Sequence, residues 1–135
     1  KKKYKINRFV YISSSMVYGD FKKNKVSETD KLSPKEIYGT MKLAGEIATK
    51  GLSKFYNIPF TIVRPSAVYG PTDMNNRVSQ IFIEKAQKGQ MIKIQGKDEK
   101  LDFTFVEDLA NGCILAASKK SGINEKWEKK LVDIK

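Results

Sequence analysis

The chain has 135 residues, 40% of them hydrophobic, and its 26 basic and 15 acidic residues give a formal net charge of +11. This length supports one modest hydrophobic core and is too short for two. No apolar run reaches the roughly 18 residues of a membrane-spanning helix, and no apolar signal segment opens the chain. We therefore expect a cytoplasmic protein without a membrane partner.

The composition gives little support for metal or disulfide chemistry. Cys113 is the single cysteine, which excludes an internal disulfide, and the absence of histidine removes the usual zinc sites, so no metal site is predicted. Cys113 lies among apolar residues at helical spacing and is expected in the core. Outside residues 1–5 the lysines are scattered, so nucleic-acid binding rests on charge alone, and an anionic nucleotide substrate fits that charge equally well.

The first half of the chain predicts two strands that flank a helix. Residues 8–13, RFVYIS, form an apolar run typical of a strand buried on both faces. A polar surface loop is expected over 19–34 and a helix over 34–56. The second strand is expected over 58–65, IPFTIVRP, and ends at a proline.

The second half continues the alternation of helices and strands. A turn-rich loop (66–76) precedes a predicted helix (77–89), and MIKIQG (91–96) and LDFTFV (101–106) have the pattern of strands. A last helix is expected over 107–120. The alternation predicts an α/β fold with a largely parallel sheet, whose ligands bind beyond the carboxyl ends of the strands.

The helix over 34–56 has two distinct faces at about 100° per residue. One is an apolar stripe made of Ala44, Ile47, Ala48, Gly51, Leu52 and Phe55. This stripe is compatible either with packing against the core or with dimer formation. The second face carries Tyr38, Lys42, Gly45 and Thr49.

Tyr38 and Lys42 are four residues apart and therefore neighbours on the helix surface. A lysine ammonium beside a phenol favours the phenolate, which can act as a general base on an alcohol while a nicotinamide takes the hydride. A serine from residues 13–15 could orient the substrate oxygen, and small helix residues such as Gly39 and Gly45 are expected to leave room for a ligand. Alone, however, the pair is also typical of a solvated helix edge.

Four segments in order resemble one known family. They are FVYISSSMVYGD, YGTMKLAGE, TIVRPSAVYGP and LDFTFVEDLANG, and together they extend over about residues 8–118. The chain resembles the extended short-chain dehydrogenases/reductases, which are NAD(P)-dependent epimerases and dehydratases that modify nucleotide sugars. The resemblance implies the C-terminal half of a Rossmann-like, doubly wound parallel sheet with the start of a small substrate-binding domain.

The resemblance also implies how the chain is divided. Residues 1–72 would be part of the NAD(P)-binding domain and 73–135 part of the substrate-binding portion, with 102–118 packing back on the first. The family's opening strand and G-x-x-G-x-x-G turn are absent from the sequence. We therefore expect an internal piece of a longer enzyme, inactive in isolation because half of the cofactor site is missing.

Roles are carried over from the family position by position. The catalytic residues would be Ser14, Tyr38 and Lys42. The residues contacting the cofactor, NAD or NADP with NAD favoured, would be Tyr38, Lys42, Pro65, Ser66 and Val68. The residues contacting the nucleotide-sugar substrate would be Ser14, Ser15, Asn75 and Arg77.

The reaction subtype follows from a departure from the family pattern. Dehydratases of the family need an Asp-Glu pair directly after the serine, but Ser15 and Met16 occupy these positions. An epimerase is therefore the leading interpretation, with the full-length protein a homodimer. A reductase or dehydratase of the same family, or a shortened non-catalytic interaction module, remains an alternative.

Overall fold

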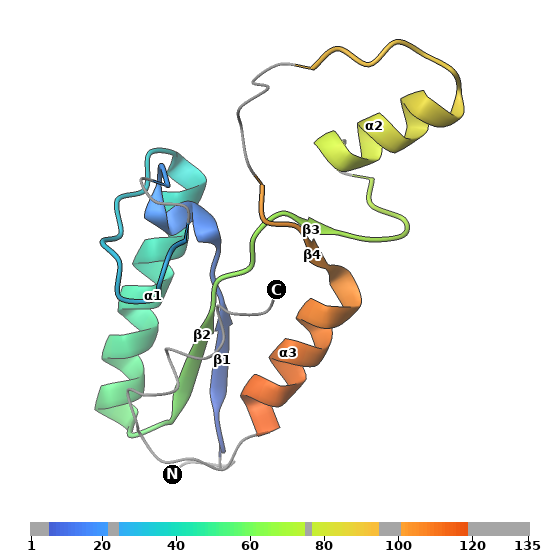
Figure 1. The fold of residues 1–135 in the computed structure, drawn as a ribbon. Helices are drawn as coiled ribbons and strands as arrows, with labels where there is room; N and C mark the ends of the chain where they lie inside the picture. Colours follow the sequence, from blue (N-terminus) through green and yellow to red (C-terminus); the bar gives the residue numbers. More distant parts are fainter. Residues whose placement is uncertain (1–5, 22–24, 75–76, 95–100, 119–135) are drawn as a thin grey trace.

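The computed structural model of the chain describes residues 6–21, 25–74, 77–94 and 101–118. The strands are β1 (Phe9–Ile12), β2 (Phe60–Val63), β3 (Val68–Tyr69) and β4 (Thr104–Phe105). The helices are α1 (Ile37–Tyr56), α2 (Val78–Gln87) and α3 (Val106–Ser118), and a short 3-10 helix, η1 (Ser15–Tyr18), follows β1. Figure 1 shows their arrangement.

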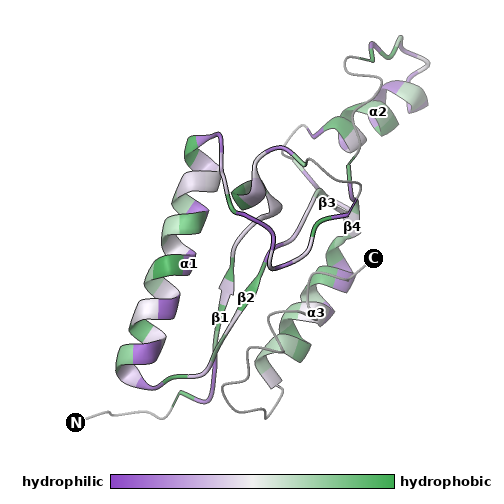
Figure 2. Cartoon of the chain, turned by 60° about the vertical axis from the view of Figure 1, so that its left-hand side comes forward, coloured by the Kyte–Doolittle hydropathy of each residue, from purple (hydrophilic) through white to green (hydrophobic). Residues whose placement is uncertain are grey.

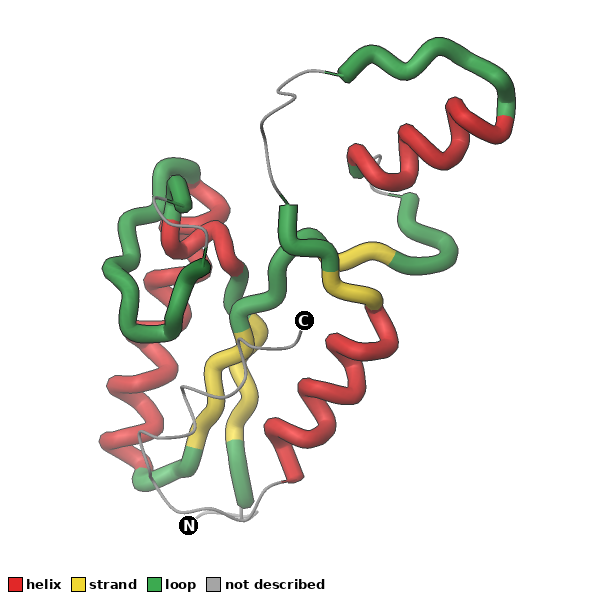
Figure 3. The backbone as a smooth tube through the Cα atoms, viewed as in Figure 1, coloured by secondary structure: helices red, strands yellow, loops and turns green. Residues whose placement is uncertain are grey.

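Two pairs of parallel strands organise the fold. β1 pairs with β2 in a register that sets Phe9 opposite Phe60, and β3 pairs with β4 with Val68 opposite Thr104. The helix α1 is the crossover connection that two parallel strands require. It lies on one side of the β1–β2 pair and α3 on the other, and both contact these strands (Figures 1 and 3). The predicted α/β fold with parallel strands is confirmed.

Several predicted boundaries change in the structure. The helices expected over 34–56 and 77–89 are α1 and α2, each slightly shortened. The helix expected over 107–120 is α3, which begins one residue earlier, and residues 119 and 120 lie outside the described residues. The strand expected over 101–106 shortens to β4, because α3 already begins at Val106. The division of the chain at residue 72 stays a prediction, although α3 does contact β1 and β2.

Two predicted element types are wrong. The strand over 91–96 is not formed in its described part, 91–94, while residues 95 and 96 lie outside the described residues. Within the loop expected over 66–76, Val68 and Tyr69 form strand β3. An alternating pattern yields a strand only where a neighbouring strand is available to pair, and here β4 pairs with β3.

The helix α1 turns a polar side toward the strands. Its buried residues are Gly39, Glu46, Thr49 and Ser53. Leu52 and Phe55 of the apolar stripe are 58% and 80% exposed. Hydrophobic positions on α1 are accordingly not confined to the side that faces the strands (Figure 2). The stripe therefore does not pack against the core of the described chain.

The described core is small, and η1, β2 and α3 supply its buried apolar side chains. Its buried apolar residues are Val17, Tyr18, Ile62, Val63 and Ala116. Helix α3 buries Gly112 and Ala116, so Cys113 between them is half-buried rather than fully inside. This partial burial raises the pKa of the Cys113 thiol.

Candidate active site

The carboxyl ends of β1 and β2 and the first half of α1 meet at one place. The backbone N–H of Ser15 donates to the carbonyl of Pro65 at 2.9 Å, which joins the segments that follow the two strands. The ammonium of Lys42 donates to the carbonyl of Ile12, also at 2.9 Å, which joins α1 to the end of β1. Three segments far apart in the sequence are thus held together where the fold class places its ligands.

Lys42 and Tyr38 lie side by side at this meeting point. The Lys42 Nζ is 5.6 Å from the centroid of the Tyr38 ring and 5.8 Å from that of Tyr11. The Tyr11 hydroxyl donates to the Lys42 carbonyl at 3.4 Å. Tyr38 is 56% exposed, while its neighbour Lys42 is held by the hydrogen bond to the end of β1.

The three consecutive serines take three different positions. The Ser13 hydroxyl is buried and donates to Glu46 Oε1 at 2.6 Å. Ser14 has an extended backbone, and its Oγ caps η1 by accepting from the N–H of Met16 at 3.2 Å. Ser15 is bound through its backbone to Pro65. A hydroxyl that accepts one hydrogen bond can still donate one of its own, and Ser14 is buried, with 8% of the residue exposed.

The glycines of α1 make room for the protein itself. A Cβ at Gly39 would lie 2.6 Å from the carbonyl oxygen of Met16, and a Cβ at Gly45 would overlap the Tyr11 hydroxyl. The expectation that these small residues leave space for a ligand is therefore wrong. They allow α1 to approach η1 and β1 closely, which brings Tyr38 and Lys42 to the strand ends.

A buried ion pair that we did not predict lies beneath the site. Arg64, directly after β2, binds both carboxylate oxygens of Glu46, from Nε to Oε1 at 2.8 Å and from Nη2 to Oε2 at 2.6 Å. The two side chains are 8% and 1% exposed. Arg64 Nη1 also donates to the Tyr18 hydroxyl at 2.8 Å and to the Glu28 carbonyl at 3.3 Å.

The pKa values of this pair move apart. Burial, the largest influence, would raise the pKa of the Glu46 carboxyl, but hydrogen bonds from Arg64 and Ser13, with the charges of Arg64 and Lys50, lower it below the ordinary 4.5. Burial likewise opposes the charge of Arg64, yet its contacts with Glu46 and Tyr18 raise its pKa above the usual range. Both groups are charged at neutral pH.

A signal for this ion pair was present in the sequence. Glu46 follows Lys42 by four residues and lies on the helix side that carries the Tyr-Lys pair. Arg64 ends an otherwise apolar strand, where an unpaired charge would be costly. Two opposite charges at such positions are candidates for pairing, but the sequence does not show that they meet.

The residues predicted to contact the cofactor after β2 lie along a bent connection. Pro65 and Ser66 are half-buried, and the Pro65 carbonyl accepts the hydrogen bond from Ser15. Ala67 has a positive φ of 27°, after which Val68 enters β3. Pro65 is thus hydrogen-bonded to the serine segment, whereas Val68 lies in β3, the strand that follows the bend.

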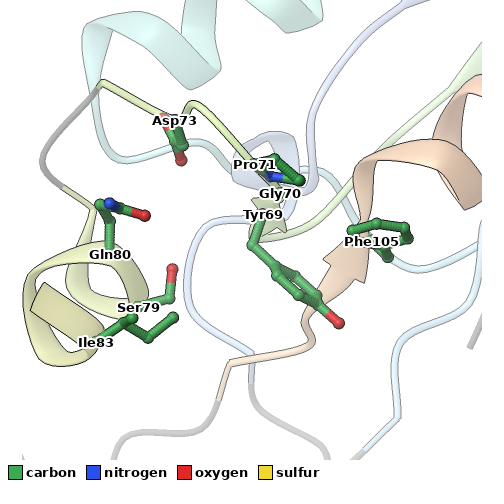
Figure 4. Close-up of a pocket in the computed structure, with 8 residues that line it drawn as sticks. All are labelled: Tyr69, Gly70, Pro71, Asp73, Ser79, Gln80, Ile83 and Phe105. Atoms are coloured by element: carbon green, nitrogen blue, oxygen red, sulfur yellow. The ribbon is translucent and has the colours of Figure 1, made fainter. Parts of the chain in front are cut away.

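Of the residues predicted to contact substrate, Arg77 lies beside a pocket between β3 and α2, whereas Ser14 and Ser15 lie at the end of β1. The pocket has a volume of about 260 Å³ and is lined by Tyr69, Gly70, Pro71, Asp73, Ser79, Gln80, Ile83 and Phe105 (Figure 4). The Nε of Arg77, just before α2, is 3.5 Å from Asp73 Oδ2. Asn75 lies outside the described residues.

The described residues contain neither a metal-binding cluster nor a membrane-spanning helix. Among the side chains placed by the structure, no three histidine, cysteine, aspartate or glutamate groups are arranged to hold a metal ion. Among the described helices, none is long and apolar enough to cross a membrane.

Comparison with known proteins gives the class of this fold and site. Residues 1–128 match the NAD dependent epimerase/dehydratase family, and the chain belongs to that family. It is 35% identical over 127 residues to a putative UDP-glucose 4-epimerase of Methanocaldococcus jannaschii, covering 90% of this chain and 42% of the relative. It is 33% identical over 125 residues to an uncharacterised UDP-glucose epimerase of Bacillus subtilis, covering 92% and 39%.

Solved structures agree with this family. The UDP-glucuronic acid 4-epimerase from Bacillus cereus, in complex with UDP-glucuronic acid and NAD, has 31% identity and a TM-score of 0.80. The similarity covers 91% of this chain and 39% of that one. The chain thus spans about two-fifths of the length of these proteins.

Proposed function

We propose that this chain is an internal part of an NAD-dependent nucleotide-sugar epimerase, with Tyr38 as the acid/base. The observation that carries the proposal is the placement of the Lys42 ammonium, held by the Ile12 carbonyl at 2.9 Å and lying 5.6 Å from the centroid of the Tyr38 ring. The similarity to proteins described as UDP-sugar epimerases supports the substrate class.

The residues at the strand ends divide the work on a sugar hydroxyl. Tyr38 takes the hydroxyl proton as the carbonyl forms and returns it when the alcohol is restored. The Ser14 hydroxyl donates a hydrogen bond to the same oxygen and so orients it. The Lys42 ammonium, held by the Ile12 carbonyl of β1, supplies a positive charge beside the reacting phenol. Epimerisation needs no further acid or base. The keto intermediate rotates in the site after the first hydride transfer, so that the second transfer reaches its other face.

The donor set at the site fits a nicotinamide nucleotide. An ammonium has three N–H groups, and the Ile12 carbonyl takes one of those of Lys42. The others can donate to ribose hydroxyls, while Pro65, Ser66 and Val68 border the nicotinamide end. When bound, NAD would supply the hydride acceptor and donor. That the solved B. cereus relative binds NAD supports this cofactor over NADP.

The missing acidic pair favours epimerisation over dehydration. Ser15 and Met16 lie in η1, directly after Ser14, and neither side chain can protonate a leaving hydroxyl or remove a carbon-bound proton at neutral pH. Ser15 and Arg77, with Asn75, are proposed to contact the nucleotide sugar. Asp73, which contacts Arg77, lines the pocket between β3 and α2.

The full-length protein is proposed to be a cytoplasmic homodimer. The apolar stripe of α1 is exposed in the described chain, and it includes Leu52 and Phe55 at 58% and 80% exposure. An exposed apolar helix face is typical of a protein–protein interface. A second copy of the same helix is its proposed partner.

The proposal is tested in the full-length protein with Tyr38→Phe. This change leaves the ring and removes the proton-transfer group, so kcat for UDP-sugar epimerisation should fall at least about 100-fold, within the range for loss of a general acid/base. Tyr56→Phe, at an exposed tyrosine at the far end of α1, is the matched control and should keep its activity. Undiminished turnover in Tyr38→Phe would contradict the assigned role.

A shortened, non-catalytic interaction module is the competing function. The exposed stripe of α1 is the observation that favours it. Full-length protein that binds neither NAD nor a UDP-sugar in calorimetry would support the module over the enzyme.

A further inference from the structure

We infer that the buried ion pair beneath the site is a positioning device for the catalytic residues. The device consists of Ser13, Tyr18, Glu46 and Arg64, here called the strand-end clamp. The inference rests on the proposed function of Ser14, Tyr38 and Lys42 and deepens it, since none of the four clamp residues has a role in proton transfer. Each clamp residue comes from a different element or strand end.

The clamp connects every segment that carries a candidate catalytic residue. Glu46 lies on α1, one turn after Lys42 and two turns after Tyr38. Ser13 directly precedes Ser14 and donates to Glu46 Oε1 at 2.6 Å. Arg64 directly precedes Pro65 and holds both oxygens of Glu46 at 2.8 and 2.6 Å. The clamp therefore fixes the distance from α1 to both strand ends.

Apolar packing gives α1 little orientation. The side of the helix that faces the strands buries Gly39, Glu46, Thr49 and Ser53, and most of the larger apolar side chains of the helix are exposed, with Leu43 half-buried. Hydrophobic contacts are non-directional, whereas a bidentate arginine–carboxylate pair allows one orientation. The rotation of α1, and with it the direction of Tyr38 and Lys42, therefore depends on the clamp.

The clamp also directs Ser14. Successive side chains of an extended chain point to opposite sides, and Ser14 has extended angles, φ −162° and ψ 153°. Because Ser13 is held toward Glu46, the Ser14 side chain is directed away from the clamp, where it caps η1. Tyr18, at the end of η1, is held by Arg64 Nη1 at 2.8 Å, so the clamp restrains both ends of the Ser14 segment.

A buried ion pair is a poor device for stability alone. Removing two charges from water is costly, and apolar residues of similar size often serve stability equally well. Apolar residues cannot supply the directional fork, which is the pair of parallel hydrogen bonds from Arg64 to the two carboxylate oxygens of Glu46. A double replacement therefore separates the two roles: stability should be largely kept, while the geometry of the reacting groups should be lost.

The test compares the full-length wild type with three variants by steady-state kinetics and thermal unfolding. Arg64→Lys keeps the charge and loses the fork. Glu46→Met/Arg64→Met keeps the volume and removes both charges. Arg8→Lys is the matched control, because Arg8 donates to Phe60 and Thr61 at the opposite end of the same two strands.

We expect kcat to fall about 10- to 100-fold in Arg64→Lys and in the double variant, the range for a small misplacement of reacting groups. KM should change less than about threefold. The double variant should stay folded and melt near the wild-type temperature, because the removal of two buried charges offsets the hydrogen bonds that Ser13 and Tyr18 lose. Arg8→Lys should match the wild type in kcat. This combination of lost turnover and retained stability is not produced by a merely structural role.

Two results would overturn the inference. One is an unchanged kcat in the folded double variant. The other is a loss of kcat in Arg8→Lys as large as in Arg64→Lys. Tyr38→Phe, assayed in parallel, keeps the two proposals distinguishable: if it stays active the proposed function fails, whereas if it is inactive and the double variant is active, only the clamp inference fails.

Discussion

At the scale of single residues, the site depends on contacts that leave no space for substitution. Gly39 is the clearest position, because its Cβ would meet the carbonyl oxygen of Met16 at 2.6 Å and that neighbour is backbone. Gly51, on the same helix, has no atom within 4 Å of its would-be Cβ. Of the three glycines of α1, Gly39 is therefore required by close packing, whereas Gly51 is not.

We expect Gly39→Ala to destabilise the full-length protein by about 1–3 kcal/mol, the usual cost of forcing extra atoms into a packed region. Gly51→Ala is the control and should stabilise it by up to about 1 kcal/mol, since alanine favours a helix over glycine. Urea unfolding measures both free energies. Equal effects of the two substitutions would contradict the close approach of α1 to η1.

The Glu46 carboxyl makes stability depend on pH with a defined sign. Its pKa is below the ordinary 4.5 in the folded chain, so the folded state favours the charged form. The stabilisation is present above the unfolded pKa and is lost as the pH falls through the folded pKa. Arg64 remains charged throughout, because its pKa is raised.

Removing this titration should flatten the acid side of the stability curve. In Glu46→Gln, the free energy of unfolding should fall less steeply than in the wild type below about pH 5. Urea unfolding at a series of pH values measures the slope. Glu107→Gln, the same change at an exposed glutamate of α3, is the control. A Glu46→Gln slope as steep as that of the wild type would show that Glu46 is not held as an ion.

At the scale of elements, α1 has its polar side inward and its apolar stripe outward. Burying Glu46 toward the strands leaves Leu52 and Phe55 at 58% and 80% exposure. The helix thus serves the site with one face and leaves the other exposed in the described chain. This is the physical basis of the proposed homodimer.

Leu52→Glu/Phe55→Glu should convert the full-length dimer into monomers, since two charges on each copy would be buried at the interface. Lys54→Glu is the matched control, because it adds the same charge to the same helix about 100° from Phe55. Light scattering during size-exclusion chromatography measures the mass. A dimer that survives the double substitution would place its interface elsewhere.

At the scale of the whole molecule, the described chain covers little of its own apolar surface. Five apolar residues are buried among those described, whereas Ile37, Met74 and Met91 are each more than 80% exposed. Soluble monomers rarely expose large contiguous apolar patches. The relatives named above are more than twice as long, which supports the proposal that further chain covers this surface.

Residues 1–135 expressed alone should therefore bind a hydrophobic fluorescent dye strongly and unfold with low cooperativity. The full-length protein should show weak dye fluorescence and a cooperative transition. The measurement is dye fluorescence together with near-ultraviolet circular dichroism for both chains. A cooperative, dye-free isolated segment would contradict the proposal that it is an internal piece.

The parts of the site that could be predicted are local in the sequence. The four-residue spacing of Tyr38 and Lys42 makes them neighbours on any helix, and the apolar runs before Ser13 and Arg64 mark the ends of two strands. The roles of individual serines could not be predicted, because adjacent identical residues differ only in what each meets. Contact between Glu46 and Arg64, 18 residues apart, likewise depends on how α1 is turned.

The class of fold, the order of the helices and of strands β1, β2 and β4, and the positions of the Tyr-Lys pair and the ends of β1 and β2 could all be read from the amino-acid sequence. Periodicity and motifs are properties of short segments, so they survive without knowledge of the partners. Which face of α1 lies inward depends on tertiary contacts, and in the structure the inward face is the polar one. The reason is that a buried charge must meet its counter-ion, and that requirement outweighs the burial of a stripe that another surface can cover.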